Sequence, residues 1–62
     1  MKYVPYLDMN VNHIRVIITS DNLSQAVEWA DAMESNGTYT LGGCSIYFTN
    51  EEDASLCMLR WG

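Results

Sequence analysis

Alternation of apolar and polar residues is clearest between positions 13 and 19. Ile14, Val16 and Ile18 fall on one face of this segment, and its β-branched composition favours a strand. Because Ile17 makes the opposite face partly apolar, the pattern predicts a central position in a sheet. Residues 2–7 are also strand-like, but Pro5 lacks a backbone donor and predicts an edge strand or an irregular arm. The residues between these two segments, 8–12, are expected to form a loop.

The following segment has the periodicity of a helix. Its apolar residues recur with the spacing of one buried stripe, namely Leu23, Ala26, Val27, Ala30 and Met33. Trp29 lies at the border of this stripe. Residues 22–25 resemble a capping box, with Ser20 and Asp21 as competing N-caps. Gly37 is predicted to end the helix in the left-handed conformation.

Two β-prone segments, residues 39–41 and 44–48, lie on either side of Gly42 and Gly43. Two short strands separated by two glycines predict a tight hairpin. One long strand with a glycine bulge is the less favoured alternative.

A second helix is predicted over residues 51–61. Thr49 and Glu52 match a T-x-x-E capping box, and the acidic residues that follow Asn50 suit the positive end of a helix. The predicted apolar face is formed by Ala54, Cys57, Met58 and Trp61.

The resulting order, (β)βαββα, predicts an α+β fold. Two helices are expected on one face of a small antiparallel sheet of three or four strands. This arrangement is a fragment of a ferredoxin-like plait that lacks the last strand, and an absent strand leaves an open edge that invites pairing. Residues 1–62 form a single domain, because a chain of 62 residues has no room for two cores.

Composition limits the classes of function. Eight acidic residues against three basic ones give a net charge of −5, which disfavours nucleic acid as a partner and mildly favours a basic protein. No apolar run is long enough to span a membrane, and the N-terminus lacks the apolar stretch of a signal peptide. We therefore expect a cytoplasmic protein that binds neither nucleic acid nor membranes.

Residues suited to catalysis or metal binding are few and scattered. His13 is the single histidine and is expected to be an exposed strand residue. A nucleophile pair of His13 with Cys44 or Cys57 has no supporting local sequence pattern, and zinc ligands would need paired spacing. Both cysteines are expected to be buried thiols, with a disulfide between them as the alternative. We predict a protein that is not an enzyme and needs no cofactor.

The second predicted helix has an irregular pattern. Leu56 and Leu59 fall opposite its apolar face, where a helix that only covers a sheet carries polar residues. Either a loop or the N-terminal arm covers them, or they form an interface with a partner or a second copy. Arg60 and Trp29 complete this predicted partner-binding surface, because Arg and Trp are favoured at binding hot spots.

The acidic face of the first predicted helix is a second candidate surface. Asp21, Glu28 and Asp31 lie opposite the apolar stripe. They could meet a basic partner, mimic a row of phosphates, or simply form a solvated helix face.

The C-terminal segment, residues 46–62, reads I-Y-F-T-N-E-E-D-A-S-L-C-M-L-R-W-G. It resembles the ends of small uncharacterised proteins of tailed phages, both T4-like and marine, which have an aromatic strand, an E-D-A turn and a final L-R-W-G helix. It departs from them at Cys57 and Met58, where Phe-Lys stands in that pattern. The resemblance implies a phage accessory protein that binds a host or viral protein in the host cytoplasm, as an inhibitor or an acidic decoy. The alternative function is a structural homodimer with a regulatory or small-molecule-binding role.

Overall fold

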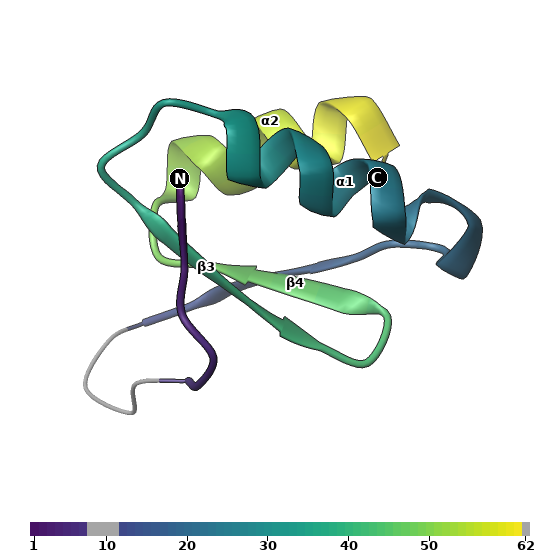
Figure 1. Cartoon of the computed structure of the whole chain (residues 1–62), viewed down its shortest axis with the longest axis horizontal. Helices are drawn as coiled ribbons and strands as arrows, with labels where there is room; N and C mark the ends of the chain where they lie inside the picture. Colours follow the sequence, from purple (N-terminus) through teal and green to yellow (C-terminus); the bar gives the residue numbers. More distant parts are fainter. Residues whose placement is uncertain (8–11, 62) are drawn as a thin grey trace.

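The computed structural model describes residues 1–7 and 12–61. The elements follow in the order β1 (Lys2–Tyr3), β2 (Ile14–Ile17), α1 (Ser20–Ala32), β3 (Thr38–Gly42), β4 (Ser45–Phe48) and α2 (Glu51–Trp61). Figure 1 shows both helices on one face of the sheet. The predicted α+β class and element order are confirmed, whereas most of the predicted 8–12 loop lies outside the described residues.

The four strands form one sheet in the order β1-β3-β4-β2. β4 pairs antiparallel with β3 and with β2, while β1 pairs parallel with β3, so the sheet is mixed rather than wholly antiparallel. β2 lies at an edge, and its predicted central position is wrong. The apolar residue on its second face, Ile17, is 66% exposed, because neither helix packs on that face of the sheet.

The predicted hairpin joins β3 and β4. Gly42 pairs with Ser45, which leaves Gly43 and Cys44 as the two-residue turn, one position later than the glycine pair suggests. Gly43 adopts a φ of 61°, which glycine tolerates at little cost. Cys44 is exposed in this turn, so its predicted burial is wrong. Both cysteines are free, which excludes the disulfide alternative, and only Cys57 is buried.

Helix α1 begins and ends earlier than its sequence pattern indicates. Its N-cap is Thr19, and the side-chain amide of Asn22 donates to the Thr19 hydroxyl at 3.2 Å instead of forming the predicted capping box. The helix ends at Ala32 with Met33 as the C-cap. Gly37 does not adopt the predicted left-handed conformation, since Gly43 is the one described glycine with a positive φ.

Helix α2 has the predicted bounds but a different N-cap. The side-chain oxygen of Asn50 accepts a hydrogen bond from the Glu52 amide at 2.9 Å. The hydroxyl of Thr49, the predicted cap, instead accepts from the Thr38 amide at 2.9 Å and donates to the Thr38 carbonyl at 3.2 Å. These hydrogen bonds of Thr49 therefore connect the start of β3 to the segment that precedes α2.

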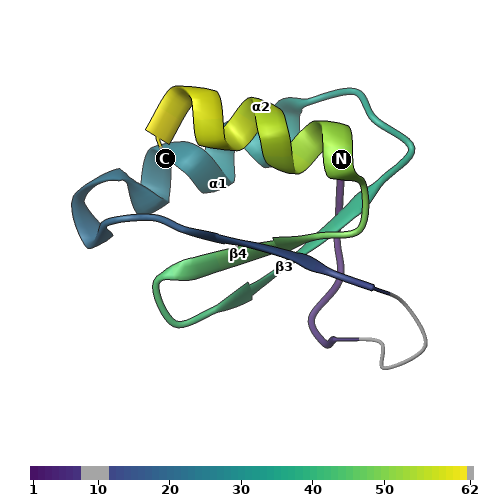
Figure 2. The same cartoon turned by 180° about the vertical axis from the view of Figure 1, so that it is seen from behind.

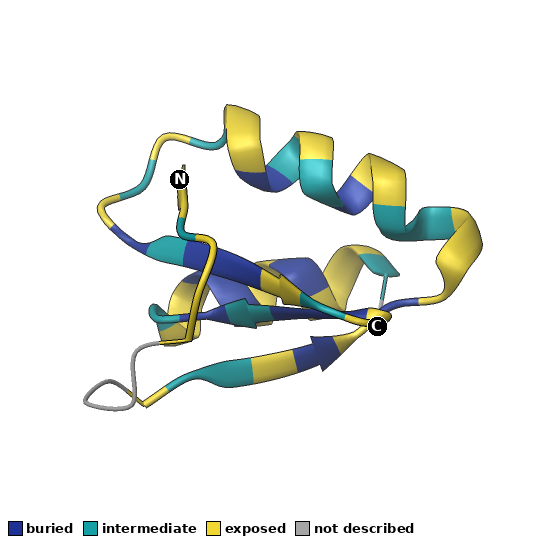
Figure 3. Cartoon of the chain, turned by 60° about the horizontal axis from the view of Figure 1, so that its bottom comes forward, coloured by how far each residue is buried: buried dark blue, intermediate teal, exposed yellow. Residues whose placement is uncertain are grey.

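The core lies between the two layers. The sheet contributes large side chains and the helices contribute small ones, and the set includes Val16, Ile18, Ile46, Phe48, Ala26, Ala30, Ala54 and Cys57. Trp29 packs edge-on against Phe48, with ring centroids 6.4 Å apart. Figure 3 shows the buried residues on the sheet-facing sides of the helices and exposed residues on their outer sides. Small residues let the helices approach the sheet closely. Because this side of each helix is buried, the side chains on the opposite side point outward.

Candidate functional site

The outer side of α2 carries the two leucines that the sequence singled out. Leu59 is 83% exposed and Leu56 is 43% exposed. No described loop or arm buries them, so the alternative in which they are covered by the chain itself is wrong. Exposed large apolar side chains that lie together are typical of interaction sites.

Met58 is the residue of α2 whose environment the pattern predicted wrongly. It was expected on the buried face, but it is 45% exposed. Asp53, Ala54 and Cys57 are the buried residues of α2. At 3.6 residues per turn, Met58 lies about 100° around the helix from Cys57 and therefore on a flank.

At the C-terminal end of α2, Arg60 lies over two tryptophan rings. Its guanidinium carbon is 5.1 Å from the ring centroid of Trp61 and 6.0 Å from that of Trp29. The two rings pack edge-on, with centroids 5.6 Å apart. These cation–π contacts order an exposed arginine where α1 and α2 meet. The contribution of Trp61 to this cluster was missed from the sequence, where the residue counted only as part of the apolar face.

The outer part of α2 thus carries Leu56, Leu59 and Arg60, and Arg60 contacts Trp29 of α1. Positions three and four apart on a helix are neighbours, so Leu56 adjoins both Leu59 and Arg60. We call these four residues the α2 surface. A shallow hollow lined by Glu51, Glu52, Ser55 and Leu56 continues it toward the start of α2. The structure therefore brings together four of the seven predicted partner-binding residues.

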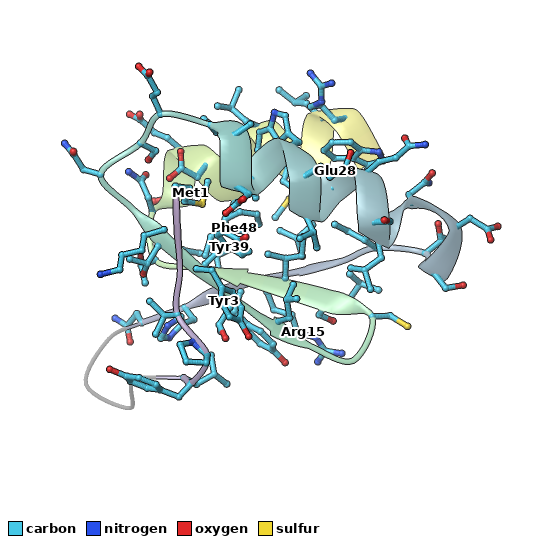
Figure 4. The ribbon with its side chains drawn as sticks, in the orientation of Figure 1. Met1, Tyr3, Arg15, Glu28, Tyr39 and Phe48 are labelled. Carbon is cyan, nitrogen blue, oxygen red and sulfur yellow. The ribbon has the colours of Figure 1, made fainter. Side chains whose placement is uncertain are left out.

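The acidic residues predicted on α1 are exposed, as expected. Asp21, Glu28 and Asp31 all lie at the surface, and Figure 4 labels Glu28 on this helix. Asp31 also accepts a hydrogen bond from the Tyr39 hydroxyl at 3.3 Å. Burial and the adjacent Asp31 carboxylate raise the pKa of Tyr39. Asp31 therefore has a role in the fold, and its position on the acidic face does not by itself indicate a role in binding.

The chemistry expected of a catalytic thiol is not favoured at Cys57. Burial raises the pKa of this thiol, which disfavours the reactive thiolate. Among residues 1–7 and 12–61, no three His, Cys, Asp or Glu side chains are grouped so that they could hold a metal ion.

Comparison with protein-family models, with curated proteins and with solved structures found no match. The resemblance of residues 46–62 to tailed-phage proteins therefore stays a prediction. Neither helix in the described part of the chain has the length and apolar character needed to cross a bilayer.

Stability is expected to fall at alkaline pH. Because the pKa values of Cys57 and Tyr39 are raised in the folded chain, the folded state holds these protons more tightly than the unfolded state. The stabilisation is fully present below the unfolded pKa values and is lost as the pH rises through the folded ones. Urea midpoints measured from about pH 7 to about pH 10 should decrease, starting near the ordinary thiol pKa of about 8.5. Cys57→Ala should weaken this dependence and Cys44→Ala should preserve it, whereas equal slopes for the two variants would contradict the assignment.

Proposed function

We propose that the chain is a non-enzymatic protein-binding module that docks through its α2 surface. The observation that carries the proposal is the exposure of Leu56 and Leu59 beside an ordered Arg60. Helix α2 does not need these leucines for packing on the sheet, because Ala54 and Cys57 already cover it.

The energetics favour this surface. Leu59 is 83% and Leu56 43% exposed, so burying the exposed parts of both side chains contributes roughly 2–4 kcal/mol before the costs of association are subtracted. Stacking on two rings restricts Arg60 before binding, which lowers the entropy lost when a partner engages it.

Charge defines the complementary surface. The chain has a net charge of −5, and Glu51 and Glu52 line the hollow beside Leu56. The partner is therefore a protein with an apolar pocket for the leucines and basic residues at its rim. The resemblance to tailed-phage proteins supports a host or viral protein as this partner, and occupation of a site on that protein as the mode of action.

The proposal is tested by changing one exposed leucine at a time. Wild type, Leu59→Glu and the matched control Leu41→Glu, whose leucine is 41% exposed on β3, are used to retain proteins from bacterial lysates. Each retained protein is then purified and its dissociation constant is measured with all three chains. We expect Leu59→Glu to weaken binding at least about tenfold, since a charge placed in an apolar contact is costly, and Leu41→Glu to leave it unchanged.

Salt separates the two candidate surfaces. Binding through the leucines should change little with NaCl, whereas binding through the acidic face of α1 should weaken steeply. Equal affinities for wild type and Leu59→Glu, together with a steep salt dependence, would move the docking site to Asp21 and Glu28 and refute the α2 surface.

A further inference from the structure

The two edges of the sheet are protected very differently. β1 has two residues, includes Lys2 and is followed by Pro5, all of which discourage pairing with another chain. β2 has four residues, Ile14–Ile17, with neither lysine nor proline. In Figure 2 this strand lies on the near side, below α2, and no other described segment passes in front of it. The β2 edge is therefore suited to pairing.

The hydrogen bonds of β2 with β4 define which of its backbone groups face outward. The Ile18 amide donates to the Cys44 carbonyl at 2.8 Å. In the same antiparallel register, Val16 is opposite Ile46. Because bonding alternates along an antiparallel strand, Ile14 and Val16 also bond toward β4. The N–H and C=O groups of Arg15 and Ile17 therefore point away from it.

The side chain of Arg15 does not block this edge. Its Nε donates to the Ser45 hydroxyl on the neighbouring strand at 3.1 Å. Figure 4 shows Arg15 on the face of the sheet that is away from the helices. The guanidinium group thus extends back toward β4 and leaves the edge accessible to another strand.

We propose that β2 pairs antiparallel with β2 of a second copy of this chain, so that one continuous sheet runs through both copies. One register that pairs the outward groups places Arg15 opposite Ile17 of the second copy. Val16 then faces Val16 of the second copy on the two-fold axis. This register avoids two arginines directly opposite each other, which would repel. It also extends the apolar, helix-facing side of the sheet without interruption.

The position of α2 fits this arrangement. The helix packs over both β2 and β4, and a two-fold axis perpendicular to the sheet keeps both α2 helices on the same face. A helix centred between β2 and β4 lies about one strand spacing, or about 4.8 Å, from a two-fold axis between the two β2 strands. The two helix axes then lie about 10 Å apart, which is the spacing of packed helices. The second copy therefore supplies a neighbour for α2 on the side away from α1.

Met58 lies on that side. Asp53 bonds to Ser35 in the α1–β3 connection, and Arg60 lies over Trp29 of α1, so both mark the flank that faces α1. Met58 is on the opposite flank, and its 45% exposure is explained if it contacts α2 of the second copy.

The size of this face is sufficient for a specific dimer. The molecule extends 30 × 23 × 17 Å along its principal axes, and Figure 2 looks down the shortest of them at the broadest side of the molecule. Specific interfaces bury about 1,200–2,000 Å² over both partners, and the broadest side of the molecule is the one that can supply such an area. Exposed apolar area is supplied by Ile17 on the β2 strand itself and by Met58 on α2 above it. Leu56 and Arg60 lie on the other flank of α2, so the pairing is independent of the proposed partner site.

Sedimentation velocity over a range of protein concentrations tests the proposal. We expect a concentration-dependent shift from the 7.0 kDa monomer to twice that mass. The shift should occur at lower concentration when NaCl is added, because each copy carries a net charge of −5. Ile17→Pro removes an outward N–H but none of the bonds to β4, and it should weaken the dimer at least about 30-fold. Ile17→Thr keeps this N–H and should change the affinity much less.

Two further variants place the helix contact. Met58→Lys should weaken the dimer, whereas Leu56→Lys, on the other flank, should not. Hydrogen exchange of the Arg15 and Ile17 amides should slow as the protein concentration rises, and this measurement needs no variant. A constant monomer mass with concentration-independent exchange would overturn the proposal. A dimer that persists in folded Ile17→Pro and Met58→Lys but dissociates in Leu56→Lys would overturn it as well.

Discussion

Replacing Phe48 with alanine is expected to leave the chain largely unfolded under conditions where the wild-type protein is folded. Phe48 is 0% exposed and is the largest of the fully buried side chains. It faces Ile14 and Tyr39 across the two neighbouring strands and packs edge-on against Trp29. One side chain thus joins three strands of the sheet to α1.

The expected cost is comparable to the whole stability of the domain. A buried Phe→Ala change costs about 3–5 kcal/mol, because the cavity cannot close completely. A domain of 62 residues has a total stability of roughly 3–9 kcal/mol. Urea unfolding followed by circular dichroism checks the prediction.

Two controls make this test specific. Phe48→Leu retains most of the volume and should keep a cooperative transition at a lower midpoint. Leu59→Ala removes an exposed side chain and should shift the stability by no more than about 0.5 kcal/mol. A cooperative transition of Phe48→Ala at the wild-type midpoint would contradict the central place of Phe48 in the core.

Elements with a strong local pattern could be predicted from the sequence. The bounds of α2 follow from its acidic start and its apolar spacing, and the hairpin follows from its glycines. The position of Leu56 and Leu59 opposite the buried face of α2 also follows from helical periodicity, because it requires only the direction in which a helical side chain points. These are properties of neighbours in sequence. The exposure of the two leucines does not follow from periodicity, because a loop or the N-terminal arm could have covered them.

The order of the strands could not be predicted in the same way. An apolar residue on the second face of β2 indicates burial only if another layer covers that face, and Ile17 shows that none does in the described chain. The parallel pairing of Tyr3 with Tyr39 likewise depends on residues far apart in sequence. Such contacts depend on tertiary packing, which local periodicity does not encode.

The helix caps and the candidate site likewise combine features that the local sequence indicates with features that depend on tertiary contacts. Thr49 and Asn50 are both good N-cap residues, and the choice between them depends on the bonds that Thr49 forms with Thr38. Arg60 and Trp29 were each predicted at a binding surface, but the contact between them links two helices that only the folded chain brings together.

Removal of the buried carboxylate of Asp53 is expected to produce the second large loss of stability. Asp53 is 4% exposed and accepts a hydrogen bond from the Ser35 hydroxyl at 2.7 Å. The same hydroxyl accepts from the Gly37 amide at 3.1 Å. The absence of a side chain at Gly37 makes room for this bond, since a Cβ there would lie 2.7 Å from the carboxylate. Asp53 thus connects the first turn of α2 to the chain between α1 and β3.

Asp53→Ala should lower the free energy of unfolding by about 1.5–3 kcal/mol, the range for a hydrogen bond to a charged group. Glu52→Ala is the matched control, because Glu52 lies in the same first turn but is exposed. It should cost only the weaker interaction with the helix dipole, about 0.3–1 kcal/mol.

A double-mutant cycle with Ser35→Ala separates the hydrogen bond from the other effects of losing the carboxylate. If the bond between Ser35 and Asp53 is the main contribution, the free energy of unfolding of the double variant should lie within about 0.5 kcal/mol of that of Asp53→Ala. Fully additive losses in urea unfolding would show instead that the two residues act separately. The coupling is expected because Asp53 lies on the flank of α2 that faces α1, and the same flank holds Arg60 over Trp29. Loss of this bond should therefore also loosen the packing that orders the α2 surface.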